Sequence, residues 1–323
     1  MSGRKRLAAL ALAAALALAA VLASAVARAQ SQAGDVSLDL LHVQGNVYML
    51  HGGAEGNLAV QIGPDGVMVV NALRQGLAEP IAAEIAAVTT APIRYIVNTS
   101  DDLHYTGGNA ELAAKGTFGA TNAARRPGAT LVAHENVMLR LTELTRSSPN
   151  PFPFEGLPLD VYILPFKDIY FNGEPVFVMH QPNAHTDGDS IVLFRKSDTI
   201  AVGDLFVPGE YPAIDVERGG SVQGLIDALK RVLDLAVPEH LQDGGTRIIP
   251  GRGRLCNEAD VVDYRNMVVI VRDRVRDLIG KDMTLDEIQA ARPTLDYDTE
   301  YRGSAADFVE SIYSSLTRTE RGP

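Results

Sequence analysis

Short apolar stretches bounded by turn residues follow one another from about residue 45 onward. Segments 46–51 and 58–62 have the length and composition of strands. Segment 67–70 is a continuous apolar run, which is typical of a strand buried on both faces. Residues 77–88 then predict a helix, and residues 93–97 predict another strand. The first half of the chain therefore mixes strands with helices.

The middle of the chain continues this alternation. Apolar side chains at helical spacing (Leu225, Leu229, Val232 and Leu233) predict a helix with one buried face. Strands are predicted at 161–165, 175–179, 190–194, 199–202 and 247–249. Strands that alternate with helices in both halves indicate a layered α/β domain.

The longest predicted helix covers residues 258–279, where apolar side chains recur every three or four positions. Asn257 is a suitable N-cap and Gly280 a suitable residue just beyond the C-terminus. Thr284 and Glu287 have the spacing of a capping box, so a further helix is expected to begin there. Residues 281–323 are therefore interpreted as a helical extension that packs on the domain.

The first residues resemble a secretory signal. Arg4, Lys5 and Arg6 precede an Ala/Leu run at 7–27, and an Ala-x-Ala site ends at Ala29. We expect cleavage after Ala29 and a periplasmic or secreted protein; an uncleaved anchor is the alternative. The predicted organisation is a signal peptide (1–29), one domain (30–280) and the C-terminal extension.

The net charge of the chain limits the classes of molecule that it is expected to bind. The net charge of the 323 residues is -11, and the signal segment is basic, so the remainder is more acidic still. Such a surface disfavours nucleic acid and anionic lipid, which leaves a small-molecule substrate or ligand and no membrane contact after cleavage. Cys256 is the only cysteine, so stability must come from packing or a bound ion and not from an intramolecular disulfide.

Residues 98–109 carry the most informative motif. Asn98 and Thr99 begin it, and Gly107-Gly108-Asn109 ends it. This frame resembles the metal-binding loop of the metallo-β-lactamase superfamily, which usually has His-x-His-x-Asp-His inside it. The four ligand positions here hold Ser100, Asp102, His104 and Tyr105.

Three later stretches extend the resemblance in the family's order. His185 lies in the second ligand motif, Asp204 in the position that can bridge two metals, and Arg252 in a position where the family has His. The resemblance covers roughly residues 44–270. It implies a single-domain αβ/βα four-layer sandwich with its site at one edge, between two central sheets.

The replaced ligands leave two interpretations of the site. In the first, Asp102, His104, His185 and Asp204 hold one divalent ion, either zinc, iron or manganese. Asp102 or Asp204 would then act as the base, and Tyr105 would act as a hydroxyl donor. In the second there is no metal, and Arg252 supplies positive charge by pairing with Asp204 or Asp102. Arg252 cannot itself bind a cation, so a two-metal site is not expected.

These alternatives correspond to different functions. The first is an exported hydrolase of an ester, thioester, amide or lactam that uses one atypical ion. The second is a metal-free pseudoenzyme or binding protein that uses the cleft in which members of the family have their active site. A metal-free enzyme that uses His104, Tyr105 and Arg252 on an anionic substrate is a third. The proline-rich segment 147–158 fits either a connector or a flap over the site.

Overall fold

The computed structural model of the protein describes residues 36–118 and 127–320, and the predicted signal segment (1–29) lies outside these residues. From Leu38 onward the chain forms one compact unit that includes the predicted C-terminal extension. No helix in the described ranges is long and apolar enough to cross a membrane.

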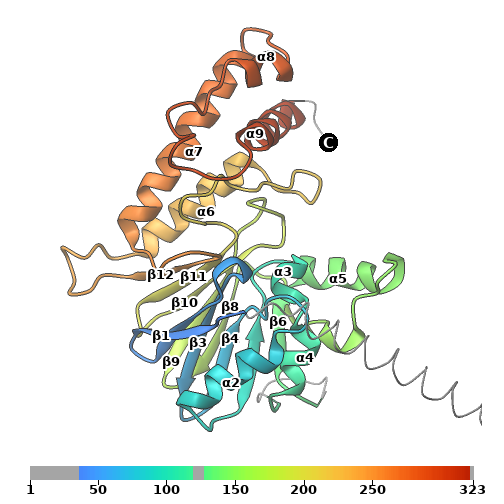
Figure 1. The fold of residues 1–323 in the computed structure, drawn as a ribbon, viewed down its shortest axis with the longest axis vertical. Coiled ribbons are helices and arrows are strands. Elements are labelled where there is room, and N and C mark those ends of the chain that lie inside the picture. Colours follow the sequence, from blue (N-terminus) through green and yellow to red (C-terminus); the bar gives the residue numbers. More distant parts are fainter. Residues whose placement is uncertain (1–35, 119–126, 321–323) are drawn as a thin grey trace, which may run out of the picture. The chain divides into compact units, whose positions relative to one another are not determined.

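The first sheet has seven strands in the order of the sequence (Figure 1). They are β1 (Asp39–Gln44), β2 (Val47–His51), β3 (Asn57–Gly63), β4 (Gly66–Val70), β5 (Ile93–Val97), β6 (Thr130–His134) and β7 (Asp160–Tyr162). Strands β1 to β4 pair in antiparallel fashion, and β4 to β7 are parallel. The carboxyl ends of the parallel strands therefore point to one edge of the sheet.

The second sheet has five strands in the order β12-β11-β10-β9-β8. They are β8 (Phe166–Phe171), β9 (Glu174–His180), β10 (Ser190–Phe194), β11 (Thr199–Gly203) and β12 (Arg247–Pro250). Only the β11–β12 pair is parallel, so these two strands also end at a common edge.

The two sheets pack face to face around an apolar core. Strand β10 shows how: Val192 and Phe194 belong to the core between the sheets, whereas Ile191 and Leu193 belong to the core beneath the helices. Since successive side chains of a strand point to opposite faces, a strand covered on both sides must be apolar throughout. All five residues of β10 are buried, and the four from Ile191 to Phe194 are apolar.

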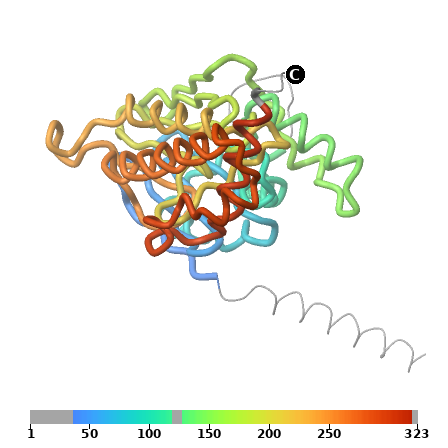
Figure 2. The backbone as a smooth tube through the Cα atoms, turned by 90° about the horizontal axis from the view of Figure 1, so that it is seen from above, coloured from blue at the N-terminus to red at the C-terminus, as the bar shows by residue number. Residues whose placement is uncertain are grey.

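Helices cover the outer face of each sheet. Helices α2 (Ala78–Val88) and α4 (Asn109–Ala114) lie against the first sheet, with α3 (Leu103–Thr106) and α5 (Glu135–Ser147) near its edge (Figure 1). Helices α6 (Val222–Leu235) and α7 (Glu258–Ile279) lie against the second sheet. Helix α9 (Ala305–Glu320) packs on these two helices (Figure 2). The predicted αβ/βα four-layer sandwich is confirmed.

The predicted helix boundaries at the C-terminus are confirmed by their capping interactions. Asn257 and Asp260 form a capping box at the start of α7, and Thr284 and Glu287 form another before α8 (Leu285–Ala290). Gly280 ends α7 but keeps a right-handed backbone conformation. Ile288 of α8 and Phe308 of α9 belong to the core under α7, so the extension is part of the packed domain.

One predicted strand is shorter in the structure than in the sequence interpretation, and the proline-rich segment 147–158 makes specific packing contacts. The strand predicted at 161–165 ends at Tyr162, because Ile163 and Leu164 point to solvent, with 69% and 65% exposure. In segment 147–158, Phe152 is buried with Leu157 against α5, and the Gly156 carbonyl accepts a hydrogen bond from Asn109. In the structure this segment therefore packs against α5 and α4 as a connector.

Candidate metal centre and its pocket

Three of the predicted ligands meet at the edge between the sheets. Asp102 follows β5, His185 precedes β10 and Asp204 follows β11. One ligand atom from each lies within 4.8 Å of the other two. Two carboxylates and one imidazole at this spacing are a suitable donor set for a divalent ion.

The imidazole of His185 is held with one nitrogen directed toward this cluster. Its Nδ1 lies 2.8 Å from the Ala213 carbonyl oxygen, which can only accept, so Nδ1 donates. Its Nε2 is buried and has no hydrogen-bond partner among the residues that the structure describes. A ring nitrogen fixed by a carbonyl on one side and free on the other is the usual arrangement of a ligating histidine.

Asp204 is held from the opposite side by a phenol. The Tyr105 hydroxyl donates to Asp204 Oδ1 at 2.8 Å, and the Tyr105 side chain is completely buried. Burial and the neighbouring Asp204 carboxylate hold the pKa of Tyr105 well above its ordinary value, so the phenol stays neutral. A Cβ atom on Gly251 would overlap the Tyr105 hydroxyl, so the glycine leaves room for this ring. Tyr105 therefore occupies space where a second histidine ligand is expected in the family pattern.

His104, the fourth predicted ligand, is not among the three residues that the structure brings together. Its Nε2 would lie 3.2 Å from a Cβ placed on Gly56, and it is buried without a hydrogen-bond partner in the described residues. The physical reason is local: α3 begins after Asp102, so the side chains at positions 102 and 104 leave the helix in different directions. The four-ligand version of the single-ion site is therefore reduced to three protein ligands.

The metal-free interpretation expects Arg252 to pair with Asp204 or Asp102. In the structure Arg252 pairs with neither of them. Its Nη2 lies 3.1 Å from a carboxylate oxygen of Glu210, which also pairs with Arg302. Asp204 and Tyr105 influence the raised pKa of Arg252 only through space. Glu210 is thus the ion-pair partner of Arg252 and is shared with Arg302.

Asp102 and His185 face each other across a short gap. His185 Nε2 and Asp102 Oδ2 are 3.9 Å apart, which is too long for a hydrogen bond but close enough for strong attraction between charges. This attraction lowers the pKa of Asp102 to about 2. Burial disfavours the charged form of His185, but Asp102, Asp189 and Asp204 outweigh burial and raise its pKa to about 10. The metal-free cluster therefore carries a protonated imidazole at neutral pH.

Zinc binding is expected to release close to one proton per ion at neutral pH. A ligating imidazole must be neutral, so His185 loses its proton, whereas Asp102 is already ionised. The apparent affinity should rise about tenfold per pH unit until the pH approaches the pKa of His185. Calorimetric titration in two buffers of different protonation enthalpy counts the protons. Binding without proton release at neutral pH would contradict this assignment.

The substitution Tyr105→Phe is expected to lower the free energy of unfolding by about 2 kcal/mol, because a charged acceptor loses its buried donor. Urea denaturation of the metal-free protein measures the change. Tyr170→Phe is the matched control, since Tyr170 is 75% exposed. Equal stability of the two variants would show that the hydroxyl of Tyr105 contributes nothing.

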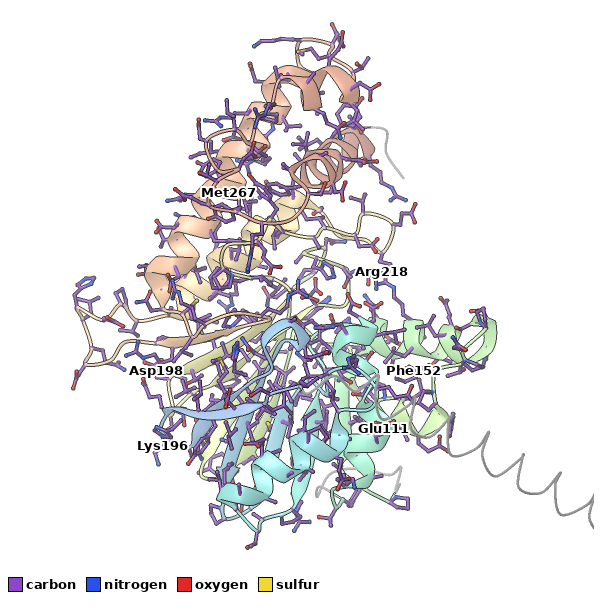
Figure 3. The ribbon with its side chains drawn as sticks, viewed as in Figure 1. Glu111, Phe152, Lys196, Asp198, Arg218 and Met267 are labelled. Carbon is purple, nitrogen blue, oxygen red and sulfur yellow. The ribbon has the colours of Figure 1, made fainter. Side chains whose placement is uncertain are left out.

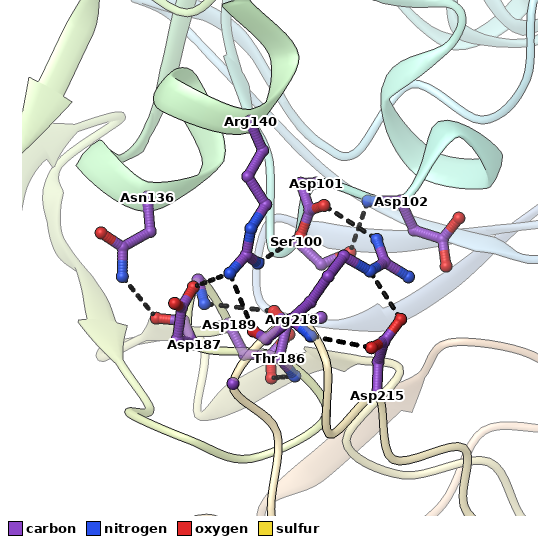
Figure 4. A network of polar contacts seen from close by, with 12 residues as sticks. Ser100, Asp101, Asp102, Asn136, Arg140, Thr186, Asp187, Asp189, Asp215 and Arg218 are labelled. Carbon is purple, nitrogen blue, oxygen red and sulfur yellow. Dashed lines mark hydrogen bonds and ion pairs between the residues drawn. The ribbon is translucent and has the colours of Figure 1, made fainter. Parts of the chain in front are cut away.

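A buried ion-pair network supports the ligand loop from behind (Figure 4). The Asp101 carboxylate is buried and pairs with Arg218 at 2.8 Å and with Arg140 of α5 at 3.5 Å. Arg218 also pairs with Asp215 at 2.7 Å, and Arg140 with Asp187 at 2.8 Å. The network joins α5 and the segment that ends at Arg218 to the residue preceding Asp102.

The residues that frame the motif have a structural role here. The side-chain amides of Asn98 and Asn109 exchange two hydrogen bonds, at 2.9 and 2.8 Å. Asn71 accepts a hydrogen bond from the Thr99 backbone at 2.9 Å. These buried amides hold the loop in place whichever residues occupy the ligand positions.

The ligand cluster opens into a pocket of about 790 Å³. Asp102 and His185 contribute to its lining, segment 211–218 forms one wall, and α9 contributes the other. Arg218 lies at the junction of the sandwich and the helical layer (Figure 3). The sequence interpretation missed this wall, because Arg218 and the residues of α9 that line it belong to no motif.

Known structures resemble this fold. The sec-alkylsulfatase Pisa1 from Pseudomonas sp. superposes with a TM-score of 0.62 at 15% identity, covering 86% of this chain and 50% of that one. A metallo-β-lactamase from Pontibacter korlensis gives a TM-score of 0.54 at 13% identity, covering 72% of this chain and 99% of that one. The DIM-1 metallo-β-lactamase gives the same TM-score and identity, covering 72% and 97%.

Neither the comparison with protein-family models nor that with curated proteins gives a match. The chain has the metallo-β-lactamase fold, and it spans about half the length of the alkylsulfatase.

Proposed function

We propose that this metallo-β-lactamase-fold protein is a hydrolase that uses a single divalent ion held by Asp102, His185 and Asp204. The observation that carries the proposal is the buried Nε2 of His185, which is directed into the cluster and has no partner within the described residues. Two carboxylates would balance the charge of a divalent ion. Three protein ligands with an open fourth position are typical of catalytic zinc sites, and zinc is the ion we expect.

An ion held there would supply Lewis acidity, which acidifies water and polarises the acceptor group of a substrate. The chain's own residues divide the remaining tasks. Asp102 is 37% exposed and lines the pocket, so its carboxylate is placed to accept a hydrogen bond from the attacking water. Tyr105 fixes the orientation of Asp204 and acts as a positioning residue. Arg252, which pairs with Glu210, stands at a position where the family pattern has a His ligand, which favours one ion over two.

The proposed substrates are esters, thioesters, amides or lactams. The test begins with elemental analysis of the purified protein after reconstitution with zinc, iron(II) or manganese(II). One equivalent of metal, hydrolysis of at least one substrate class, and loss of that rate with a chelator support the proposal. Less than about a tenth of an equivalent of any of these metals would end it.

A metal-free binding protein remains the competing function, and thermal stability separates the two. An ion present at a hundred times its dissociation constant stabilises the native state by about 2.7 kcal/mol. Chelation should therefore lower the melting temperature of the reconstituted hydrolase. An unchanged melting temperature and unchanged ligand binding would favour the metal-free function.

We further propose that the protein acts outside the cytoplasm on a small molecule, after cleavage behind Ala29, and binds neither nucleic acid nor membrane. The basic, apolar and small-residue regions of segment 1–29 support this proposal. The N-terminal residue of protein recovered from the periplasm or the medium should be Gln30. Recovery of the intact chain in the membrane fraction would instead indicate an anchor.

A further inference from the structure

The pocket above the ligand cluster is polar and asymmetric in charge. Asp102 and His185 contribute to its lining, and the outer walls come from segment 211–218 and one face of α9. Residues Asp307, Glu310, Ser311 and Ser314 repeat at helical spacing and line this face, while Val309 and Ile312 of the same helix belong to the core. The C-terminal helix thus presents a row of polar groups to any molecule that reaches His185.

The acidic groups on these walls are not neutralised by neighbours. Glu217, Asp307 and Glu310 are exposed, and their carboxylates make no ion pair within residues 36–118 and 127–320. Asp215, by contrast, pairs with Arg218 at 2.7 Å. The outer pocket therefore keeps three free carboxylates.

The two guanidinium groups of the pocket offset this charge only in part. Arg218 already serves two carboxylates, Asp101 and Asp215. Arg318 donates to the Val216 carbonyl at 2.8 Å and is the one cation left without an ion pair in the described part of the pocket. An anionic substrate tail would meet more negative than positive charge here.

The pocket also offers apolar surface beside the acids. Tyr211 lines it and is partly exposed, and it stacks on the buried ring of Phe308 with ring centroids 5.4 Å apart. Alkyl groups around a charged nitrogen can contact such rings while the carboxylates attract the charge.

We propose that the substrate carries a cationic group, a primary or quaternary ammonium, on the side of the molecule away from the bond that is hydrolysed. This inference rests on the proposed function, because the buried Nε2 of His185 fixes where the reacting end lies. Asp307 and Glu310 of α9 and Glu217 of the facing wall are the residues that select the ammonium group.

A matched pair of esters tests the selection on the zinc-reconstituted protein. Acetylcholine and neohexyl acetate have nearly the same shape, but the second has a neutral carbon in place of the charged nitrogen. Hydrolysis adds water across each ester bond and releases acetic acid and the alcohol. We expect kcat/KM for the charged ester to exceed that for the neutral ester by about tenfold at low salt, and the ratio to fall as salt screens the carboxylates.

Variants identify the source of the preference. The double substitution Asp307→Asn and Glu310→Gln should bring the ratio close to one, and both positions are exposed, so folding should be preserved. The control Asp243→Asn removes an exposed acid outside the pocket and should leave the ratio unchanged. A ratio near one in the unmodified protein overturns the inference, as does a ratio that the double variant does not change.

If neither ester is hydrolysed, a binding measurement decides the selectivity, while metal analysis and the other substrate classes still decide the proposed function. Choline and neohexyl alcohol are titrated into the protein by calorimetry. Binding of choline that is about tenfold tighter, and that weakens in the double variant but not in Asp243→Asn, supports the inference. Equal affinities, or no saturable binding of either compound, overturn it.

Discussion

Replacing His185 with asparagine is expected to abolish stoichiometric binding of a divalent ion. His185 supplies the only imidazole of the three-residue cluster, and within that cluster its Nε2 is a buried atom without a hydrogen-bond partner in the described residues. Loss of a supporting residue alone weakens a metal site by about ten- to a hundredfold, so loss of a ligand should weaken it by at least a hundredfold. Elemental analysis and calorimetric titration measure the change, and chelator-sensitive hydrolysis should disappear with it.

Asparagine is chosen because its amide nitrogen can still donate to the Ala213 carbonyl, which His185 Nδ1 contacts at 2.8 Å. The variant therefore removes the metal ligand but keeps the hydrogen bond that holds the side chain in the fold. His240→Asn is the matched control, since His240 is exposed and remote from the cluster. Unchanged metal affinity in His185→Asn would remove the basis of the proposed function.

Removing both arginines that face Asp101 is expected to lower the free energy of unfolding by about 3 kcal/mol. In the variant Arg140→Met, Arg218→Met, the Asp101 carboxylate keeps its burial, at 4% exposure, but loses its two cationic partners. The estimate lies at the low end for a broken buried pair, because the two arginine side chains are 21% and 36% exposed. Urea denaturation measures the loss.

Adding Asp101→Asn to this double variant should restore most of the stability, because it removes the uncompensated charge. Arg254→Met is the control for deleting an arginine from a solvent-exposed pair, since its side chain is 65% exposed, and it should change stability by less than about 1 kcal/mol. If the double variant is no less stable than Arg254→Met, the Asp101 network does not hold the ligand loop.

The layers of this fold could be predicted from sequence because burial leaves a direct pattern. Strand β10 is apolar from Ile191 to Phe194 since both of its faces are covered, and α7 shows its buried face at helical spacing. The capping boxes at Asn257 and Thr284 depend on residues three positions apart, so local sequence is sufficient to predict them.

Strands that depend on distant partners were not predicted. Strand β1 is mostly exposed, and β8 alternates exposed and buried residues at an edge of its sheet. Their extended conformation comes from pairing with β2 and β9 and not from a strong apolar pattern.

The site was predictable where a ligand position has a motif around it. Asp102, His185 and Asp204 each follow or precede a strand in a recognisable frame, and the structure brings them together. His104 has the same frame, but the direction of its side chain depends on where α3 begins, and this cannot be read from spacing. The partner of Arg252 was also unpredictable, because Glu210 belongs to an irregular segment without a motif.

One short segment determines two properties of this protein. Residues 211–218 form a wall of the pocket, and the Ala213 carbonyl in the same segment fixes the ring of His185. A mutation that reshapes the wall to admit a different molecule therefore also shifts the imidazole that retains the ion. Laboratory evolution toward new substrates should accordingly encounter a trade-off, in which gains in substrate range come with weaker ion retention until a compensating mutation restores the position of Ala213.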